Sequence, residues 1–221
     1  MKIRLGDLRR IIREAVGEGE GLAAYVTEEH GGFKATVYNS AAVENLLRKS
    51  LGYIDDETMA KLKRYTVGRV QVLKPMDPCW DAMMIASIAG PGKLMYGVAY
   101  ALSPSGLLIS DRDSMTSDAL SAWKRMAAKA DRGKKELDDV NEPATPDPYD
   151  DCELRPEEFL NHAYEAQGWE KVELRSMQEE HERLMKTLTA TGKLTRLAIE
   201  LAISAAGLSY FQTRYREALQ G

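Results

Sequence analysis

The sequence predicts an α/β fold in which a mixed sheet is flanked by helices. Three features indicate this class: a strand, glycine loop, helix, strand, helix unit between Ala82 and Met126, a β-hairpin with two helices before that unit, and long helices after it. Crossover units of this kind place their ligand loop at the carboxyl end of a strand. We therefore expect one main core with a helix before it and a helical extension after it.

The composition is typical of a globular protein, with 44% hydrophobic and 29% charged residues among 221. The net charge of -4 argues against a nucleic-acid partner, because binding a phosphate backbone requires Lys and Arg in clustered excess. No apolar run approaches the roughly 20 residues of a membrane-spanning helix, and no secretory signal is apparent. We expect a chain made in the cytoplasm that has no membrane partner.

The cysteines and histidines do not form a recognisable site in the sequence. Cys79 and Cys152 are too few for a disulfide framework and suit a reducing cytosol. No Cys-x-x-Cys or His-x-x-x-His spacing is present, so we do not expect zinc. His30, His162 and His181 are scattered, and we expect each of them at the surface.

Three regions are expected along the chain: residues 1–21, 22–151 and 152–221. The first begins with a basic amphipathic helix over residues 1–16, which places apolar residues near one face and arginines around the other. The stretch GEGEG at 17–21 then acts as a linker, because alternating glycines destabilise a helix.

The second region contains the elements of the α/β core. Glycines in the turn at 29–32 favour a hairpin, and Ser40 and Asp55 or Asp56 can cap the next two helices. The expected elements are strands 22–27 and 33–38, helices 41–51 and 57–65, strands 67–73 and 82–88, helix 94–102, strand 106–110, and a helix from Thr116 or Ser117 to Met126.

The last part of the chain is expected to be helical after a proline-rich, acidic loop at 138–151. Pro156 can start a helix, since proline is tolerated in the first turn. Residues 172–188 and 195–219 form two further helices that could pair as a hairpin. The second has an apolar stripe formed by Leu197, Leu201, Ala205 and Leu208.

The glycine loop is the strongest candidate for a ligand site. A strand ends in the sequence SIAGPGK and runs directly into a helix. Backbone N–H groups exposed at a helix N-terminus favour a phosphate, because the helix dipole adds to the unsatisfied donors. Taken alone, two glycines before a helix often serve only close packing.

The order of elements around this loop resembles the fold of the GNAT acetyltransferases. In that family the loop contains Gln or Arg, two residues, Gly, one residue, then Gly or Ala, and it holds the pyrophosphate of acetyl-CoA. Gly90 and Gly92 match this pattern, while Ser87 stands at the Gln or Arg position and Pro91 has no N–H to donate. The resemblance implies acetyl-CoA as a cofactor held by Gly90, Gly92 and Lys93.

The family often carries a catalytic tyrosine in its last helix, four residues after a small residue. Here Ala119 and Trp123 occupy these positions. An indole N–H releases no proton near neutral pH, so the usual acid is missing. We expect Trp123 to fill the core or line a groove, and in an active enzyme Asp111 or a water would relay the amine proton.

A longer series of short motifs resembles GNAT-like proteins encoded by tailed bacteriophages. Their order implies a phage origin and that Cys79 and Cys152 approach each other. The motifs are Cys79-Trp80, Gly90 to Tyr96, Asp111-Arg112 before Ser117, Trp123, Leu137 to Asp139, Thr145-Pro146 and Asp150 to Cys152.

The N-terminal segment is similar to the helices of T-even-like phage proteins that are packaged into the prohead. Ile12-Arg13-Glu14 followed by Ala15 fits the prohead protease pattern of a hydrophobic residue, any residue, Glu, and then a small residue. The resemblance implies a capsid-targeting peptide cleaved between Glu14 and Ala15. The alternative is a helix that docks on the protein's own surface.

Two further groups of charged residues have both a functional and a structural interpretation. Asp111 and Arg112 follow a strand, where α/β sheets place ligand-contacting residues, but nearby acids such as Asp113 would also hold the arginine in place. Four acids could bind a hard cation, although without EF-hand spacing we expect them to be solvated or paired with arginine. These acids are Asp138, Asp139, Asp150 and Asp151.

Three functional hypotheses follow from the sequence. The first is a phage GNAT-fold protein that is associated with the virion, with an eroded acetyl-CoA groove and terminal helices that contact other virion proteins or a second copy. The second is an active N-acetyltransferase that acts on an amine or a host protein. The third is a helical assembly protein without a ligand.

Overall fold

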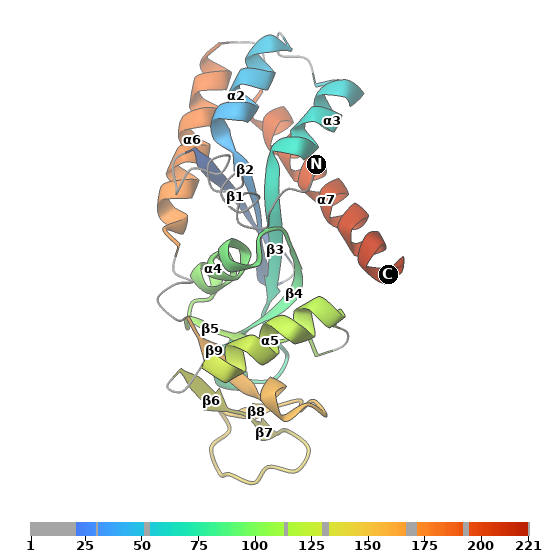
Figure 1. The fold of residues 1–221 in the computed structure, drawn as a ribbon. Helices are drawn as coiled ribbons and strands as arrows, with labels where there is room; N and C mark the ends of the chain where they lie inside the picture. The colour runs from blue at the N-terminus through green and yellow to red at the C-terminus, as the bar shows by residue number, and fades with distance from the viewer. Residues whose placement is uncertain are drawn as a thin grey trace. The chain divides into compact units, whose positions relative to one another are not determined.

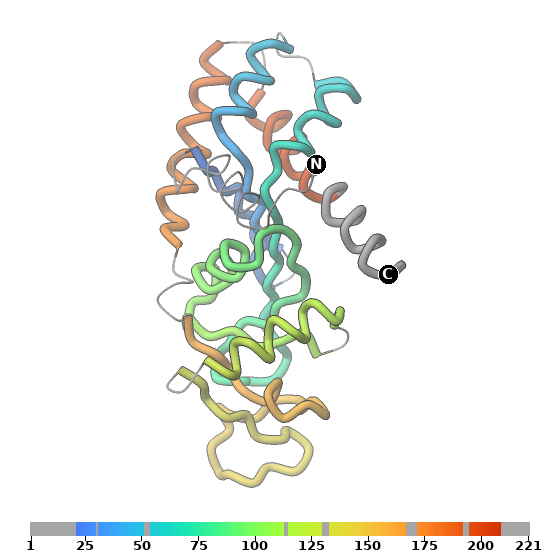
Figure 2. The backbone as a smooth tube through the Cα atoms, viewed as in Figure 1, coloured from blue at the N-terminus to red at the C-terminus, as the bar shows by residue number. Residues whose placement is uncertain are grey.

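The computed structural model describes residues 21–29, 31–50, 54–112, 115–129, 133–166, 172–191 and 195–220, with side chains through Leu208 in the last range (Figure 2). The expected N-terminal helix and the protease site at Glu14 and Ala15 lie outside these residues. The same holds for His30 and Asp113. The structure therefore does not test the predictions made for them.

The described chain forms a mixed seven-stranded sheet flanked by helices, which confirms the α/β class (Figure 1). The spatial order of its strands is β1-β2-β3-β4-β5-β9-β6. The strands are β1 (Leu22–Glu29), β2 (Gly32–Asn39), β3 (Thr66–Leu73), β4 (Met83–Ala89), β5 (Leu107–Ile109), β9 (His162–Glu165) and β6 (Lys134–Glu136). A second, two-stranded sheet pairs β7 (Asp138–Asp139) with β8 (Asp151–Cys152).

Strand directions change along the sheet. Strands β3 and β4 are antiparallel, β4 and β5 are parallel, and β9 runs antiparallel to both β5 and β6. The last strand in the sequence therefore lies between two strands that precede it. Sequence analysis expected neither β6 nor β9.

Local signals account for the hairpin and for the two helices that follow it. Gly31 has a φ of 75°, which glycine adopts at little cost. Helix α2 (Ser40–Lys49) is capped by Asn39, whose side chain accepts a hydrogen bond of 2.8 Å from the Ala42 N–H. The prediction of Ser40 as the cap was therefore wrong by one residue. Helix α3 (Asp56–Tyr65) is capped by Asp55 as predicted.

The chain divides into two compact units, each made from separate segments. The described part of unit 1 includes Thr36–Val67 and Arg175–Tyr210, with the start of β1 up to Tyr25. Its core joins these segments, and Gly207 lets α7 (Arg196–Gln220) approach β2 closely: a Cβ there would lie 2.7 Å from a Thr36 methyl group. The core residues include Ala23, Tyr38, Val43, Leu47, Leu62, Leu184, Met185, Ile199 and Ile203.

Unit 2 contains Val26–Ala35, Gly68–Leu174 and the end of α7. Helix α4 (Gly92–Leu102) packs on β4 and β5. Close packing is possible because Gly68 of β3 has no side chain: a Cβ there would lie 2.5 Å from the Met95 sulfur. Helix α5 (Ser117–Lys129) contributes the buried Trp123 and Met126.

The region after the acidic loop differs from the prediction. No helix starts at Pro156; a 3-10 turn at Glu158–Leu160 leads instead into strand β9. A strand of four residues shows too little alternation to be recognised in the sequence. The two long helices are present as predicted, as α6 (Leu174–Ala190) and α7.

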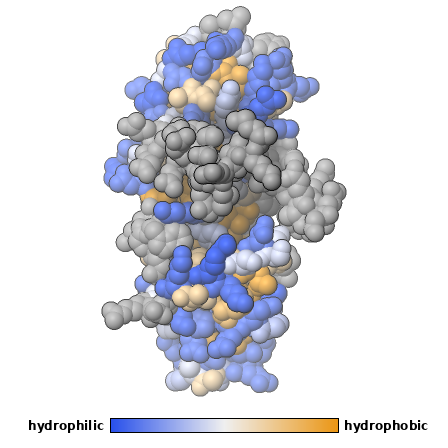
Figure 3. Space-filling view, viewed as in Figure 1, coloured by the Kyte–Doolittle hydropathy of each residue, from blue (hydrophilic) through white to orange (hydrophobic). Residues whose placement is uncertain are grey.

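The face of the molecule in Figure 3 is largely hydrophilic, with hydrophobic residues gathered in small patches. Three of the six exposed large hydrophobic side chains of the described chain lie on α7, namely those of Leu197, Leu201 and Leu208. In the part of the chain that the structure describes, no helix combines the length and hydrophobicity needed to cross a bilayer.

Candidate functional site

The loop between β4 and α4 is exposed at the carboxyl end of a central strand. Gly90, Pro91, Gly92 and Lys93 are all accessible to solvent. Gly90 has a φ of 116°, a conformation that residues with a side chain rarely adopt. Glycine at this position is therefore required by the turn itself, and the helix begins two residues later, at Gly92.

The N-terminus of α4 presents backbone N–H groups that precede the first hydrogen bond within the helix. Pro91 is the N-cap residue, and no side chain caps the helix. The first intrahelical hydrogen bond runs from the Met95 N–H to the Pro91 carbonyl at 2.9 Å, so the N–H groups of Gly92, Lys93 and Leu94 precede it. These three donors and the helix dipole form a favourable environment for an anion.

A basic pocket lies beside this helix end. Its empty volume is about 600 Å³, part of it open to solvent. Three exposed cations line it, Lys93 from α4 and Arg125 and Lys129 from α5, while Tyr96 and Met126 supply buried apolar surface. Gly92 borders the same pocket, and nothing lies within 4 Å of the position of a Cβ added to it.

Sequence analysis identified Lys93 but missed Arg125 and Lys129. Arg125 lies in the predicted helix, but Lys129 lies beyond Met126, where the predicted helix ended. The observed helix α5 extends to Lys129 and places the two residues four positions apart, on one face. What the sequence could not show is that this face is turned toward the glycine loop. Only the packing of α5 near the start of α4 brings the three positive charges together.

The registered pairing of β4 with β5 ends before the glycine loop. Their parallel pairing has two registered pairs, Met83 with Leu108 and Met84 with Ile109. Strand β5 ends at Ile109, whereas β4 continues to Ala89 and remains paired with β3 on its other side. The later residues of β4 therefore have no registered partner on β5.

Trp123 fills the core, which is one of the two roles expected for it. Its side chain is 2% exposed. Its ring lies edge-on to Tyr96 with centroids 6.0 Å apart, and at 5.6 Å from the ring of Tyr164. Trp123 does not line the basic pocket, so it contributes packing rather than chemistry.

Asp111 and Arg112 follow β5, as the sequence indicated, but they do not line the basic pocket. Asp111 is partly exposed, and Arg112 is buried with an exposure of 6%. Arg112 Nη1 donates a hydrogen bond of 3.2 Å to the Leu160 carbonyl. Neither residue is among those that line the pocket with Gly92 and Lys93.

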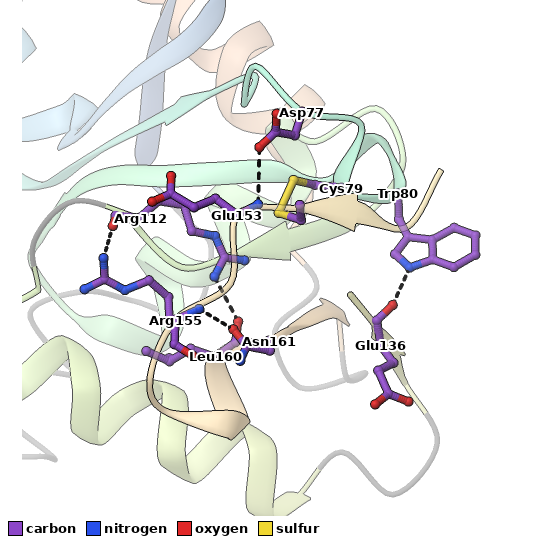
Figure 4. Close-up of a disulfide and its surroundings, with 10 residues drawn as sticks. Asp77, Cys79, Trp80, Arg112, Glu136, Glu153, Arg155, Leu160 and Asn161 are labelled. Carbon is purple, nitrogen blue, oxygen red and sulfur yellow. Dashed lines mark hydrogen bonds between the residues drawn. A yellow bond between two sulfur atoms is a disulfide. The ribbon is translucent and has the colours of Figure 1, made fainter. Parts of the chain in front are cut away.

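Cys79 and Cys152 form a disulfide, although their number and spacing had not predicted one (Figure 4). Both residues are buried, and the bond links the turn after β3 to β8. The approach of the two cysteines, which the phage resemblance implied, is confirmed. Disulfides persist mainly in oxidising surroundings.

The turn that contains Cys79 is strained. Cys79, Trp80 and Asp81 have φ values of 45°, 59° and 53°, in the left-handed region that costs about 1–2 kcal/mol per residue. The Trp80 backbone N–H donates to the Tyr149 carbonyl at 2.6 Å, and its indole donates to the Glu136 carbonyl at 2.7 Å. These bonds and the disulfide together maintain the unusual conformation.

The acidic loop has a local structural explanation. Carboxylate oxygens of Asp138, Asp150 and Asp151 lie within 4.8 Å of one another. The backbone N–H of Thr145 holds the pKa of Asp138 below its usual value, and the Thr145 hydroxyl donates to Asp150. Desolvation and the charge of Asp150 raise the pKa of Asp151. This loop does not contribute to the basic pocket.

Unit 1 contains a buried polar network that the sequence did not predict. His181 is 5% exposed, which corrects the expectation of a surface histidine. Its Nδ1 lies 2.5 Å from the Tyr38 hydroxyl, its ring stacks on Tyr25, and its Nε2 is 3.8 Å from Glu200. The partners come from β1, β2 and α7, far apart in the sequence.

Comparison of the chain with models of known protein families, with curated proteins and with solved structures gave no match. The geometry of the loop, the pocket and the strands around them therefore provides the indications of function.

Proposed function

We propose that this chain is a GNAT-like protein, of the kind encoded by tailed bacteriophages, and that it binds acetyl-CoA or a related acyl-CoA through its phosphates. The observation that carries the proposal is the uncapped start of α4 beside Lys93, Arg125 and Lys129. Helix N-termini and clustered cations both favour phosphate. Tyr96 and Met126 provide apolar surface for less polar parts of the ligand.

The end of the β4–β5 pairing at Met84 supports a ligand with an extended, amide-bearing arm. Beyond Met84, the edge of β4 that faces β5 has no registered partner among the described pairs. Backbone groups on such an edge form hydrogen bonds with an added extended segment. The amides of an acyl-CoA arm match this requirement, and the arm would start from the phosphates held at the loop.

Binding is better supported than catalysis. Trp123 occupies the position at which GNAT acetyltransferases often carry a catalytic tyrosine, and it is buried in the core. Asp111, the acid expected to replace it, does not line the basic pocket. We therefore expect affinity for acyl-CoA with acetyl transfer that is slow or absent.

Thermal unfolding with added cofactor tests the binding proposal. At a hundred times its dissociation constant, acetyl-CoA adds about 2.7 kcal/mol to the free energy of unfolding, which raises the melting temperature. CoA should act similarly, since the phosphates supply the main contacts. If millimolar acetyl-CoA leaves the melting temperature unchanged, the proposal is wrong.

Substitutions in the pocket should weaken this effect without unfolding the protein. Lys93→Ala and Arg125→Ala each remove an exposed charge, so we expect the dissociation constant of acetyl-CoA to rise by about tenfold for each. Lys124→Ala is the matched control for Arg125→Ala, because Lys124 is exposed on the same helix, α5, but does not line the pocket. Equal effects at Arg125 and Lys124 would indicate nonspecific attraction.

A second candidate function is assembly within the phage particle, favoured by the outer face of α7. Leu197, Leu201 and Leu208 are 65%, 60% and 43% exposed, while Ile199 and Ile203 on the inner face are buried. A helix with two apolar faces suits packing against a further protein surface.

Two measurements test the assembly role. Mass spectrometry of purified virions should detect the chain, and an N-terminus at Ala15 would reveal cleavage after Glu14. Leu197→Glu/Leu201→Glu should abolish any self-association seen by analytical ultracentrifugation. A monomer that is found only in infected cytoplasm would remove this candidate.

A further inference from the structure

Arg112 is a buried cation with unused hydrogen-bond donors. Its side chain follows β5 and is 6% exposed, and its Nη1 donates to the Leu160 carbonyl. Its Nε and Nη2 are buried and have no hydrogen-bond partner among the residues that the structure describes. Such donors are rare in folded proteins, because a buried N–H group without an acceptor costs free energy.

A second arginine, Arg155, contacts the backbone of Arg112 (Figure 4). Arg155 Nη1 donates to the Arg112 carbonyl. The backbone of Arg155 is fixed by Asn161, which accepts from the Arg155 N–H at 2.7 Å and donates to the Arg155 carbonyl at 2.8 Å. Arg155 Nε is also buried, and no described residue forms a hydrogen bond with it.

The charges at this point are not balanced by direct contacts. Burial first, and then repulsion by Arg155, lower the pKa of Arg112 to about 10, against the weaker opposing effects of Glu153, Asp111 and Asp77. Arg112 therefore keeps its proton at neutral pH. The repulsion by Arg155 lowers the pKa of Arg112 by more than the attraction of any single one of these acids raises it.

The unused atoms of Arg112 have the geometry of an oxyanion site. Nε and Nη2 lie on one edge of the guanidinium and donate in parallel to two oxygens of a carboxylate or phosphate. The hydrogen bond to Leu160 leaves this edge unoccupied while restraining the group. We propose that Arg112, assisted by Arg155, binds an oxyanion, either a carboxylate or a phosphate, through this edge.

This site is distinct from the basic pocket at α4. None of the pocket's lining residues belongs to the segments that hold Arg112 and Arg155. A buried water is the simplest competing explanation, since it could accept a hydrogen bond from the same atoms. A water would leave the positive charge uncompensated, so the two explanations differ in their response to added anions.

Anion titration in a background without the phosphate pocket tests the proposal. In the Lys93→Ala/Arg125→Ala chain, acetate, phosphate and chloride are added at constant ionic strength, and the melting temperature is followed. We expect saturable stabilisation by acetate, phosphate or both, but not by chloride. The tighter of the two oxyanions identifies the class of the natural ligand.

Substitution of Arg112 then tests whether the stabilisation by an oxyanion comes from binding at its guanidinium group. Arg112→Lys in the same background keeps the charge but loses the two-donor edge, so the dissociation constant of the oxyanion should rise by about tenfold or more. Arg175→Lys is the matched control, because Arg175 is 92% exposed on α6. An Arg112→Lys chain that binds the oxyanion as tightly as its parent would overturn the proposal.

The titration remains decisive even if Arg112→Lys does not fold. If neither acetate nor phosphate stabilises the chain that retains Arg112, the proposal is wrong. That outcome would leave acyl-CoA binding untouched, because the background already lacks two cations of the α4 pocket. Conversely, loss of acyl-CoA binding in the native sequence would not affect this site.

Discussion

At the scale of single residues, Trp123 shows how a large aromatic side chain can serve core packing. Its indole is enclosed by Tyr96 and Tyr164, and its exposure is 2%. Burial also raises the pKa of Tyr164 to about 12, and the Tyr164 hydroxyl donates to the Phe159 carbonyl. Neither aromatic group is suited to release a proton near neutral pH.

Substituting Trp123 should therefore affect stability and not ligand affinity. Trp123→Ala removes a large buried side chain and should lower the free energy of unfolding by about 3–5 kcal/mol. Trp123→Phe keeps a ring in the core and should cost less. Urea unfolding measures both, and acetyl-CoA affinity measured on Trp123→Phe should match that of the parent. A loss of affinity with full stability would indicate a direct role.

His181 should make the stability of unit 1 depend on pH. Burial, partly offset by the charge of Glu200, lowers the pKa of His181 below its usual value. The unfolded chain then takes up a proton on this residue below about pH 6.5, while the folded chain does not. The free energy of unfolding should be constant above that pH and fall as the pH decreases from about 6.5 toward 5.5.

The surroundings of His181 determine the control for this pH dependence. Tyr25 and Tyr38 face it from the strands, Arg196 and Glu200 from α7, and Glu182 neighbours it on α6; their ordinary pKa values lie outside the window. His181→Gln should flatten the slope between pH 5.5 and 7 in denaturation experiments. Burial and the charge of Lys134 also lower the pKa of His162, which is less buried than His181. His162→Gln should therefore reduce the slope less than His181→Gln does, and the reverse result would refute the assignment.

At the scale of elements, the junction of β4 and α4 contains two glycines with different roles. Gly90 has a positive φ, so Gly90→Ala should lower the free energy of unfolding by about 1–2 kcal/mol. Gly92 begins the helix with open space around it, and Gly92→Ala should leave stability unchanged or slightly higher.

Variants of these two glycines can also distinguish an effect on folding from an effect on ligand binding. A methyl group at position 92 would project toward the pocket that Gly92 borders, so Gly92→Ala should weaken acetyl-CoA binding while the protein stays fully folded. Differential scanning fluorimetry with and without cofactor measures both properties. Unchanged affinity in a stable Gly92→Ala chain would argue that the ligand does not approach this backbone.

Elements with strong local signals could be predicted from the sequence. The glycine turn, the cap at Asp55, the helical periodicity of α2 to α5 and the glycines before α4 all act within a few residues of one another. The missed elements depend on distant partners. Strand β9 has four residues, and its place between β5 and β6 follows from pairing across more than 50 residues on one side and about 30 on the other.

The candidate sites likewise contain some residues that could be predicted from the sequence and others that could not. Gly90, Gly92 and Lys93 are adjacent in the chain and were predicted as one group, whereas Arg125 and Lys129 join them only through packing. Arg112 was singled out in the sequence, yet its proximity to Arg155 depends on the turn that carries Asn161. His181 was misjudged because Tyr25 and Tyr38 precede it by more than 140 residues.

At the scale of the whole molecule, the disulfide should contribute a large share of the stability. Cys79 and Cys152 are 73 residues apart, and closing a loop of that length in the unfolded chain is worth about 4 kcal/mol. We expect Cys79→Ser/Cys152→Ser to lower the free energy of unfolding by roughly that amount. Urea unfolding with and without reductant provides the comparison.

Mass spectrometry after alkylation is the control for that experiment. The oxidised protein should incorporate no label at either cysteine until it is unfolded and reduced, because both side chains are buried. Labelling of the native protein at both residues would show that the bond does not form in solution.

The insertion of β9 between β5 and β6 has a consequence for how the chain matures. Strand β9 pairs with Leu107 and Leu108 on one side and with Lys134 to Glu136 on the other. Until residue 165 leaves the ribosome, both neighbours present unsatisfied edges, which are sites of aggregation. Messages truncated before His162 should therefore yield insoluble fragments. Slowed translation at that point would lengthen the time during which the unpaired strand edges can aggregate.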